Sequence, residues 1–143
     1  QAPAAYYLQC LDMIEHSNMR DRCAWVDQWR AEDECLSYLA MADLIVLPYI
    51  DYGGFGSSAA ARTCLRVNKP MLVTNTPFLS DLIDDEIAYG MSEIEELDYY
   101  IEECLRSEHT NILERSKEYV SRNSWQEVSS SHVKLYKQLA GRI

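Results

Sequence analysis

The sequence has no apolar run close to the roughly 20 residues that a helix needs to cross a bilayer. Its first 20 residues also lack the basic-then-apolar layout of a secretory signal peptide. The five cysteines are widely spaced and never form a CxxC pair, which argues against a disulfide framework and against a zinc site. We therefore expect a soluble, cytoplasmic protein that is not transmembrane and has no bound metal and no cofactor.

Basic residues are scarce in one part of the chain. The net charge is -10, and residues 81–108 contain eleven acidic side chains and one basic side chain, Arg106. The rest of the chain has twelve of each sign. A nucleic-acid-binding surface needs positive charge, so we expect no nucleic-acid partner. The acidic stretch is a candidate docking face for a basic partner, although such runs are more often plain solvated surface.

The composition is ordinary for one globular domain, with 48% hydrophobic and 25% charged residues in a chain of 143. Two apolar runs without alternation, residues 44–47 (LIVL) and 70–74 (PMLVT), predict strands buried on both faces, as in a parallel sheet. Residues 23–27 (CAWVD) predict a third strand. Helical spacing over about residues 32–42 and 57–67 completes the strand, helix, strand order of a doubly wound α/β sheet.

The two ends of the chain are predicted to be helical. Apolar residues recur at helical spacing over about residues 4–18 and in three segments beyond residue 94, the last of them capped by Ser124. A chain that opens inside a helix and has so few strands predicts that one or two amino-terminal βα units are missing, which leaves a sheet edge in need of cover. We therefore expect residues 1–143 to be a single domain within a larger protein.

A glycine-rich loop, residues 51–58 (DYGGFGSS), joins the strand at 44–47 to the helix that follows. Its glycines let the backbone bend and approach a ligand, and Ser57 and Ser58 supply hydroxyls and a good helix N-cap. Ligands bind beyond the carboxyl ends of the strands in doubly wound sheets, and free N–H groups at a helix start favour an anion. The pattern thus predicts a diphosphate site, and the alternative is a glycine-rich βα turn that binds no ligand.

Several residues near the loop are open to two interpretations. Arg62 can reach a phosphate with its planar guanidinium, or it is a solvated helix residue. Asn75 and Thr76 follow the strand at 70–74 and either line the pocket or form the turn before Pro77. The loop lacks the GxGxxG fingerprint and the lysine of a P-loop, so neither a dinucleotide site nor a nucleoside triphosphate hydrolase is indicated.

The order of these segments resembles the carboxy-terminal domain of GT-B glycosyltransferases, most of all glycosyltransferase family 4. The resemblance covers the chain from about Asp21 to Leu139. It is carried by the run ECLSYLAMADLIVLP at residues 34–48, the glycine loop, Asn68-Lys69-Pro70 before MLVTN, and Ser124-Trp125 before the last helix.

This resemblance implies a Rossmann-like domain that binds a nucleotide diphosphate sugar, paired with an acceptor-binding amino-terminal domain in the same parent enzyme. The parent would transfer a hexose to an acceptor, while this part alone would be inactive. No catalytic residue is assigned. The expected donor and diphosphate contacts are Gly54, Phe55, Gly56, Ser57, Ser58, Arg62 and Thr63.

The chain departs from that family at two glutamates, eight positions apart, that usually contact the donor. Counting back from Asn68-Lys69-Pro70 places these positions at Phe55 and Thr63. Aligning on the GFG triplet places them at Gly53 and Ala61, so both carboxylates are absent in either register. Their absence favours an alternative in which the domain is a catalytically inactive scaffold or interaction module.

Overall fold

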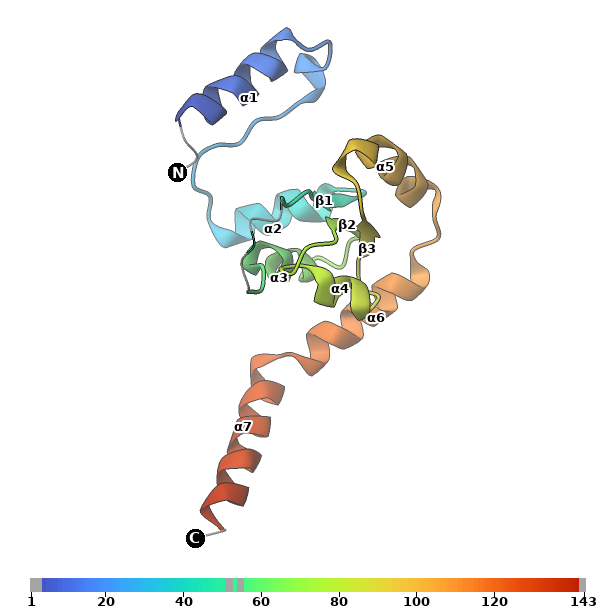
Figure 1. The fold of residues 1–143 in the computed structure, drawn as a ribbon. Coiled ribbons are helices and arrows are strands. Elements are labelled where there is room, and N and C mark those ends of the chain that lie inside the picture. The colour runs from blue at the N-terminus through green and yellow to red at the C-terminus, as the bar shows by residue number, and fades with distance from the viewer. Residues whose placement is uncertain (1–3, 51–52, 54–55, 142–143) are drawn as a thin grey trace. The chain divides into compact units, whose positions relative to one another are not determined.

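The computed structural model describes residues 4–50, 53 and 56–141. The chain divides after Arg30 into two compact units, an amino-terminal unit (Gln1–Arg30) and a main unit (Ala31–Ile143), and each is described by itself. Figure 1 shows the elements of both units.

The amino-terminal unit consists of a helix, α1 (Ala4–His16), and a short 3-10 helix, η1 (Arg20–Arg22). The Tyr7 hydroxyl donates to the Asp27 carboxylate, and the Tyr7 and Trp25 rings meet edge to face with 5.9 Å between their centroids. The predicted strand at residues 23–27 is wrong, because the structure has no strand there. Those residues are exposed, and a strand forms only where a neighbouring strand takes up its backbone hydrogen bonds.

The main unit is built on three parallel strands in the described residues, in the order β1 (Ile45–Leu47), β2 (Met71–Thr74) and β3 (Tyr89–Met91). Val46 pairs with Leu72, and Val73 pairs with Gly90. The strands predicted at 44–47 and 70–74 are therefore confirmed, and the sheet is parallel as expected. The sequence pattern does not predict β3, because it has three residues with a glycine at its centre.

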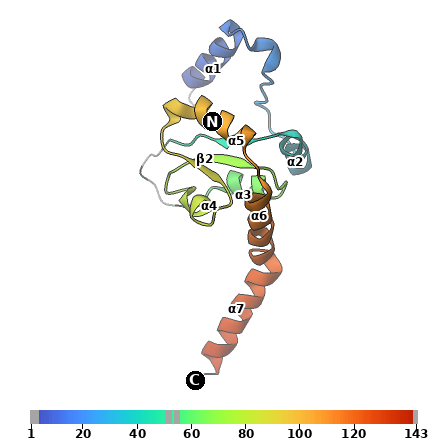
Figure 2. The same cartoon turned by 90° about the vertical axis from the view of Figure 1, so that its right-hand side faces the viewer.

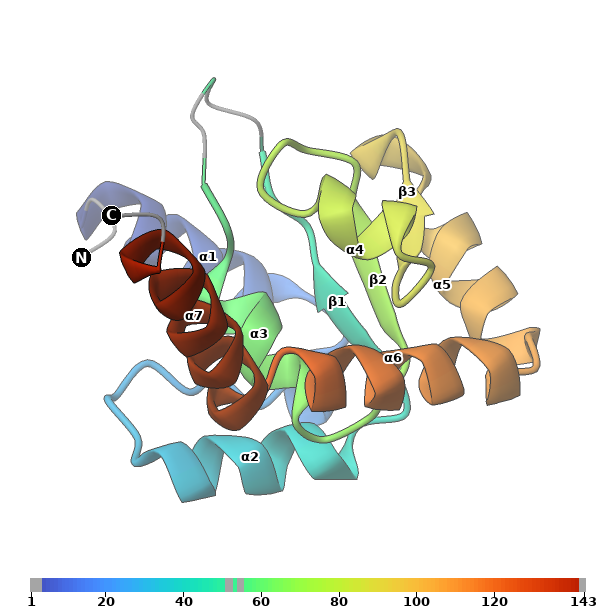
Figure 3. The ribbon, with the colours of Figure 1, turned by 90° about the horizontal axis from the view of Figure 1, so that it is seen from below.

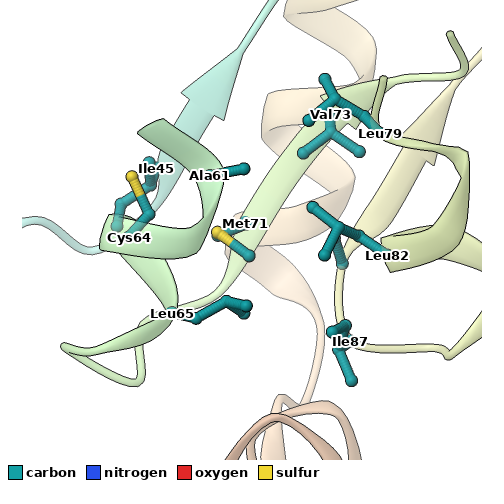
Figure 4. Close-up of a cluster of buried hydrophobic side chains, with 10 residues drawn as sticks. Ile45, Ala61, Cys64, Leu65, Met71, Val73, Leu79, Leu82 and Ile87 are labelled. Carbon is teal, nitrogen blue, oxygen red and sulfur yellow. The ribbon is translucent and has the colours of Figure 1, made fainter. Parts of the chain in front are cut away.

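Helices cover both faces of this sheet. On one face, Met71 and Val73 of β2 pack with residues of α3 (Ala59–Leu65) and α4 (Ser80–Asp84), as Figure 4 shows. On the other face, Leu72 packs with Cys104 of α5 (Leu97–Arg106). Figure 2 shows α5 on the opposite side of β2 from α4. All four residues of β2 are buried, which explains its continuous apolar run.

The remaining helices belong to the same unit. α2 (Glu32–Met41) packs Leu39 against the core on the α3 side, and a 3-10 helix, η2 (Ile94–Glu96), leads into α5. α6 (Thr110–Arg122) contacts both α3 and α7 (Trp125–Ala140), so the carboxy-terminal part is helical as predicted. Among the described residues, no helix combines the length and the apolar character that a membrane span requires.

The burial of Leu72 predicts a large contribution to stability. Leu72 of β2 is 0% exposed and packs against α5. Leu72→Ala should lower the free energy of unfolding by about 2–5 kcal/mol, because the variant loses the transfer free energy of the buried side chain and leaves a cavity. The matched control Leu105→Ala, on α5 at 54% exposure, should change it by about 0.5 kcal/mol or less. Urea unfolding with an unchanged m-value is the measurement. Equal losses for the two variants would contradict the packing described here.

The cysteines should differ in reactivity. Burial raises the pKa of the Cys64 and Cys104 thiols, which lowers their thiolate fraction, whereas Cys23 is exposed. We expect iodoacetamide to alkylate Cys23 first and to reach Cys64 and Cys104 only after denaturant is added. Peptide mass spectrometry at several reaction times measures this order. Early labelling of Cys104 would show that α5 does not cover the sheet.

Candidate functional site

Two loops leave the carboxyl ends of the neighbouring strands β1 and β2, and Figure 3 shows them at the same end of the sheet. The loops touch, because a Cβ added to Gly56 would lie 3.4 Å from the Phe78 ring. The Thr74 hydroxyl also donates to the Tyr49 carbonyl at 2.8 Å, which ties the end of β2 to the residues after β1. Residues 56–60 and 75–78 together form what we call the loop mouth.

The structure places part of the predicted site in this mouth. Gly56, Ser57 and Ser58 follow β1, and Asn75 and Thr76 follow β2, so these residues come after the carboxyl ends of two neighbouring parallel strands. The predicted contacts Gly54 and Phe55 lie outside the described residues. Gly56 has a φ of +157°, a conformation that residues with a side chain rarely adopt.

Backbone N–H groups at the start of α3 face the mouth without acceptors. In the described part of the chain, the amides of residues 57–60 donate no hydrogen bond to a protein group. Ser57, Ala59 and Ala60 are exposed residues, whereas Ser58 is buried. Several N–H groups that converge at the start of a helix attract an anion.

The two serines of the mouth have different roles. Ser58 is buried, its oxygen accepts from the Ala61 N–H at 3.1 Å, and it shares a hydrogen bond of 2.8 Å with the Tyr49 hydroxyl. Ser58 is therefore the N-cap of α3, as predicted, and its side chain is occupied by that task. Ser57 is exposed and holds its hydroxyl at the surface of the mouth.

Arg62 is bound on several sides by the protein itself. Its Nε and Nη2 donate to Ser57 Oγ at 3.2 and 2.9 Å, and Nη2 also pairs with the Asp81 carboxylate. Its Cζ lies 5.6 Å from the centroid of the Tyr119 ring, at cation–π distance. The buried Nη1 has no partner among the described residues.

Sequence reasoning missed Asp81 and Tyr119 as parts of this site. The two residues come from α4 and α6, and no motif or spacing in the sequence connects them to Arg62 on α3. A signal for Asp81 was present only as one acid in the acidic stretch, where charge composition alone does not distinguish it from its neighbours.

Thr63 lies on the face of α3 that points away from the core. Together with Arg62, it lines an open cavity of about 730 Å³. The cavity lies between α3, α6 and the start of α7, and the Glu32–Arg66 ion pair forms part of its wall. None of its described lining residues belongs to the loop mouth. The Thr63 hydroxyl donates to the Ala59 carbonyl at 3.2 Å, so its oxygen remains able to accept a hydrogen bond.

The described residues contain no group of His, Cys, Asp and Glu side chains that could hold a metal ion. Away from the mouth, the Tyr89 hydroxyl and His109 share a hydrogen bond, with 2.9 Å between Tyr89 Oη and His109 Nδ1. Burial raises the pKa of Tyr89, so its phenol stays protonated at neutral pH. The geometry of the mouth is therefore that of an anion-binding site rather than that of an acid-base pair.

Comparison with protein-family models, with curated proteins and with solved structures gives no match for this chain.

The Ser58 cap predicts a measurable loss of stability. Ser58→Ala removes the acceptor of the Ala61 N–H and the partner of Tyr49, and should lower the free energy of unfolding by about 0.5–2 kcal/mol. Ser37→Ala is the matched control, because the Ser37 hydroxyl only donates back to Asp33 within α2. Thermal or urea unfolding of both variants is the measurement, and equal stability would show that Ser58 does not cap α3.

Proposed function

We propose that this chain is the donor-binding, carboxy-terminal domain of a GT-B glycosyltransferase, with a Rossmann-like doubly wound sheet. Its parent would transfer a hexose from a nucleotide diphosphate sugar to an acceptor held by a separate amino-terminal domain. The observation that supports the proposal is the loop mouth at the carboxyl ends of β1 and β2, where the amides of residues 57–60 have no acceptor among the described residues.

The chemistry of the mouth suits a diphosphate. Phosphate oxygens accept several hydrogen bonds, and each bond to a charged group is worth about 1.5–3 kcal/mol. The Ser57 hydroxyl belongs to the residue just before the N-cap Ser58, and the absence of a Cβ at Gly56 lets the Phe78 ring pack against the loop. Thr63 lies further along α3, where its oxygen can accept from a ribose hydroxyl of the nucleotide.

The position of α3 also supports one of the two registers with glycosyltransferase family 4. Ala61 is 1% exposed in the core, so a carboxylate at its position would be buried against the sheet rather than held near a ligand. Thr63 lines the open cavity beside α3. We therefore propose the register that equates Thr63 with the second glutamate of the family.

Transfer would need both domains of the parent. The loop mouth offers hydrogen-bond donors but no pair of carboxylates among its described residues, so its contribution is to bind and orient the donor. The acceptor and the rest of the catalytic groups would come from the amino-terminal domain. The five free cysteines suit a reducing cytoplasm, where we place the enzyme.

The second candidate function is a non-catalytic scaffold that keeps the fold. The absence of both family glutamates favours it, and the acidic stretch at residues 81–108 would then meet a basic partner. The two candidates differ in turnover. Release of free UDP or GDP from a UDP-hexose or GDP-hexose by the full-length protein would exclude the scaffold, whereas tight binding without turnover would favour it.

Nucleotide binding tests the proposed site directly. Calorimetric titration of the full-length protein with UDP and with GDP should show binding, and Ser57→Pro or Gly56→Val should weaken it tenfold or more, about 1.4 kcal/mol. Proline removes the Ser57 N–H, and valine brings a side chain toward Phe78. Ser37→Ala on α2 is the control and should bind as the wild type does. Unchanged affinity in both loop variants would count against this site.

A further inference from the structure

We propose that Arg62 is a positioning residue, which fixes the Ser57 hydroxyl as a hydrogen-bond donor toward a phosphate oxygen and does not itself contact the phosphate. Asp81 holds Arg62 in place for this task. The inference rests on the proposed function and assigns a role within the same site.

The hydrogen bonds at Ser57 determine the direction of its proton. A hydroxyl has one donor hydrogen and two acceptor lone pairs. Arg62 Nε and Nη2 both donate to Ser57 Oγ, at 3.2 and 2.9 Å, so the oxygen acts as acceptor on the side of the guanidinium. The Ser57 hydrogen must then point away from Arg62, and among the described residues no acceptor receives it. Ser57 is thereby prepared to donate to an incoming acceptor.

Arg62 itself is poorly placed to serve as the phosphate ligand. The Asp81 carboxylate compensates its charge, and the Tyr119 ring lies against its guanidinium. Nε and Nη2 are occupied by Ser57 and Asp81, and Nη1, which has no partner among the described residues, is buried, so a direct phosphate contact would require the guanidinium to move. Because these partners come from α4, α6 and the loop, the position of Arg62 is determined by the packing of three elements on α3.

A second hydroxyl without an acceptor lies at the same edge of the sheet. Thr76 is 6% exposed, and its Oγ1 has no hydrogen-bond partner among the described residues. It belongs to the loop whose Phe78 ring packs against Gly56. Buried hydroxyls are nearly always hydrogen-bonded in native proteins, so the Thr76 hydroxyl is available to donate to a ligand that binds at this edge. A diphosphate would bring acceptors and no donors.

A double-mutant cycle on the affinity for UDP or GDP, whichever binds more tightly, tests the role of Arg62. Ser57→Ala and Arg62→Gln should each weaken binding about tenfold, the loss of one hydrogen bond to a charged group. The double variant should also lose only about tenfold, because Arg62 acts through Ser57. A loss of about a hundredfold in the double variant would mean that Arg62 contacts the ligand independently, and would overturn the inference.

Substitution of Asp81 gives a second test. Simple electrostatics and a positioning role for Asp81 predict opposite changes in the affinity for the nucleotide. Removing a negative charge close to an anion site should tighten binding if only electrostatics mattered. If Asp81 holds Arg62 in position, Asp81→Asn should instead weaken binding several-fold, and should add little to Arg62→Gln. Tighter binding by Asp81→Asn would overturn the inference.

Two further variants control for folding and for charge. Arg106→Gln removes another ion-paired arginine of the main unit, one whose partner is Glu102 on the same helix, and should leave the affinity unchanged. Arg62→Lys keeps the positive charge but lacks the planar guanidinium. This variant replaces Arg62→Gln in the double-mutant cycle if circular dichroism shows that the glutamine variant does not fold. Full affinity in Arg62→Lys would show that charge alone is required and would overturn the inference.

The outcomes separate the two proposals. If the wild-type protein binds neither UDP nor GDP, the proposed function fails and the role of Arg62 fails with it. If the wild type binds and the cycle is additive, the donor site stands and only the positioning role is lost. If the wild type binds, the cycle is non-additive and Asp81→Asn weakens binding, both proposals are supported.

Discussion

The burial of β2 on both of its faces is the constraint on which the rest of the main unit depends. β2 lies between β1 and β3, and its side chains alternate between the core shared with α3 and α4 and the core shared with α5. Parallel pairing then places the carboxyl ends of β1 and β2 next to each other. The loops that follow these strands meet at one edge for that reason, and the loop mouth is a consequence of the packing of the core.

Some polar contacts of the mouth stabilise the fold, and others leave groups available to bind a ligand. Ser58 is used by the fold, because its oxygen caps α3 and bonds to Tyr49. Ser57 accepts only from Arg62 among the described residues and stays exposed. Arg62 links the mouth to α4 through Asp81 and to α6 through Tyr119. The helices that cover the sheet therefore also hold the groups with which the proposed donor site would bind a diphosphate.

The sequence correctly predicted the two strands β1 and β2. It wrongly predicted a strand at residues 23–27 and did not predict β3. Continuous apolar runs identify β1 and β2, because a strand buried on both faces leaves no room for polar residues. The run at residues 23–27 looks similar but forms no strand, since a strand depends on a partner that lies elsewhere in the chain. β3 shows the reverse: Gly90 offers no apolar signal, yet the strand pairs with β2, and a Cβ on Gly90 would lie only 2.9 Å from Ile83 of α4.

What the sequence determined by itself is local: the apolar runs, the glycine loop, and the Ser58 cap, whose donor and acceptor are three residues apart. Hydrogen bonds of that kind form within one turn of a helix, so the order of residues is enough to identify them. The tertiary structure alone decided that Arg62 meets Asp81 and Tyr119, and that the Phe78 ring lies against Gly56 of the glycine loop. Those contacts join different helices and loops, and they exist only because the sheet is covered on both faces and aligns its strand ends.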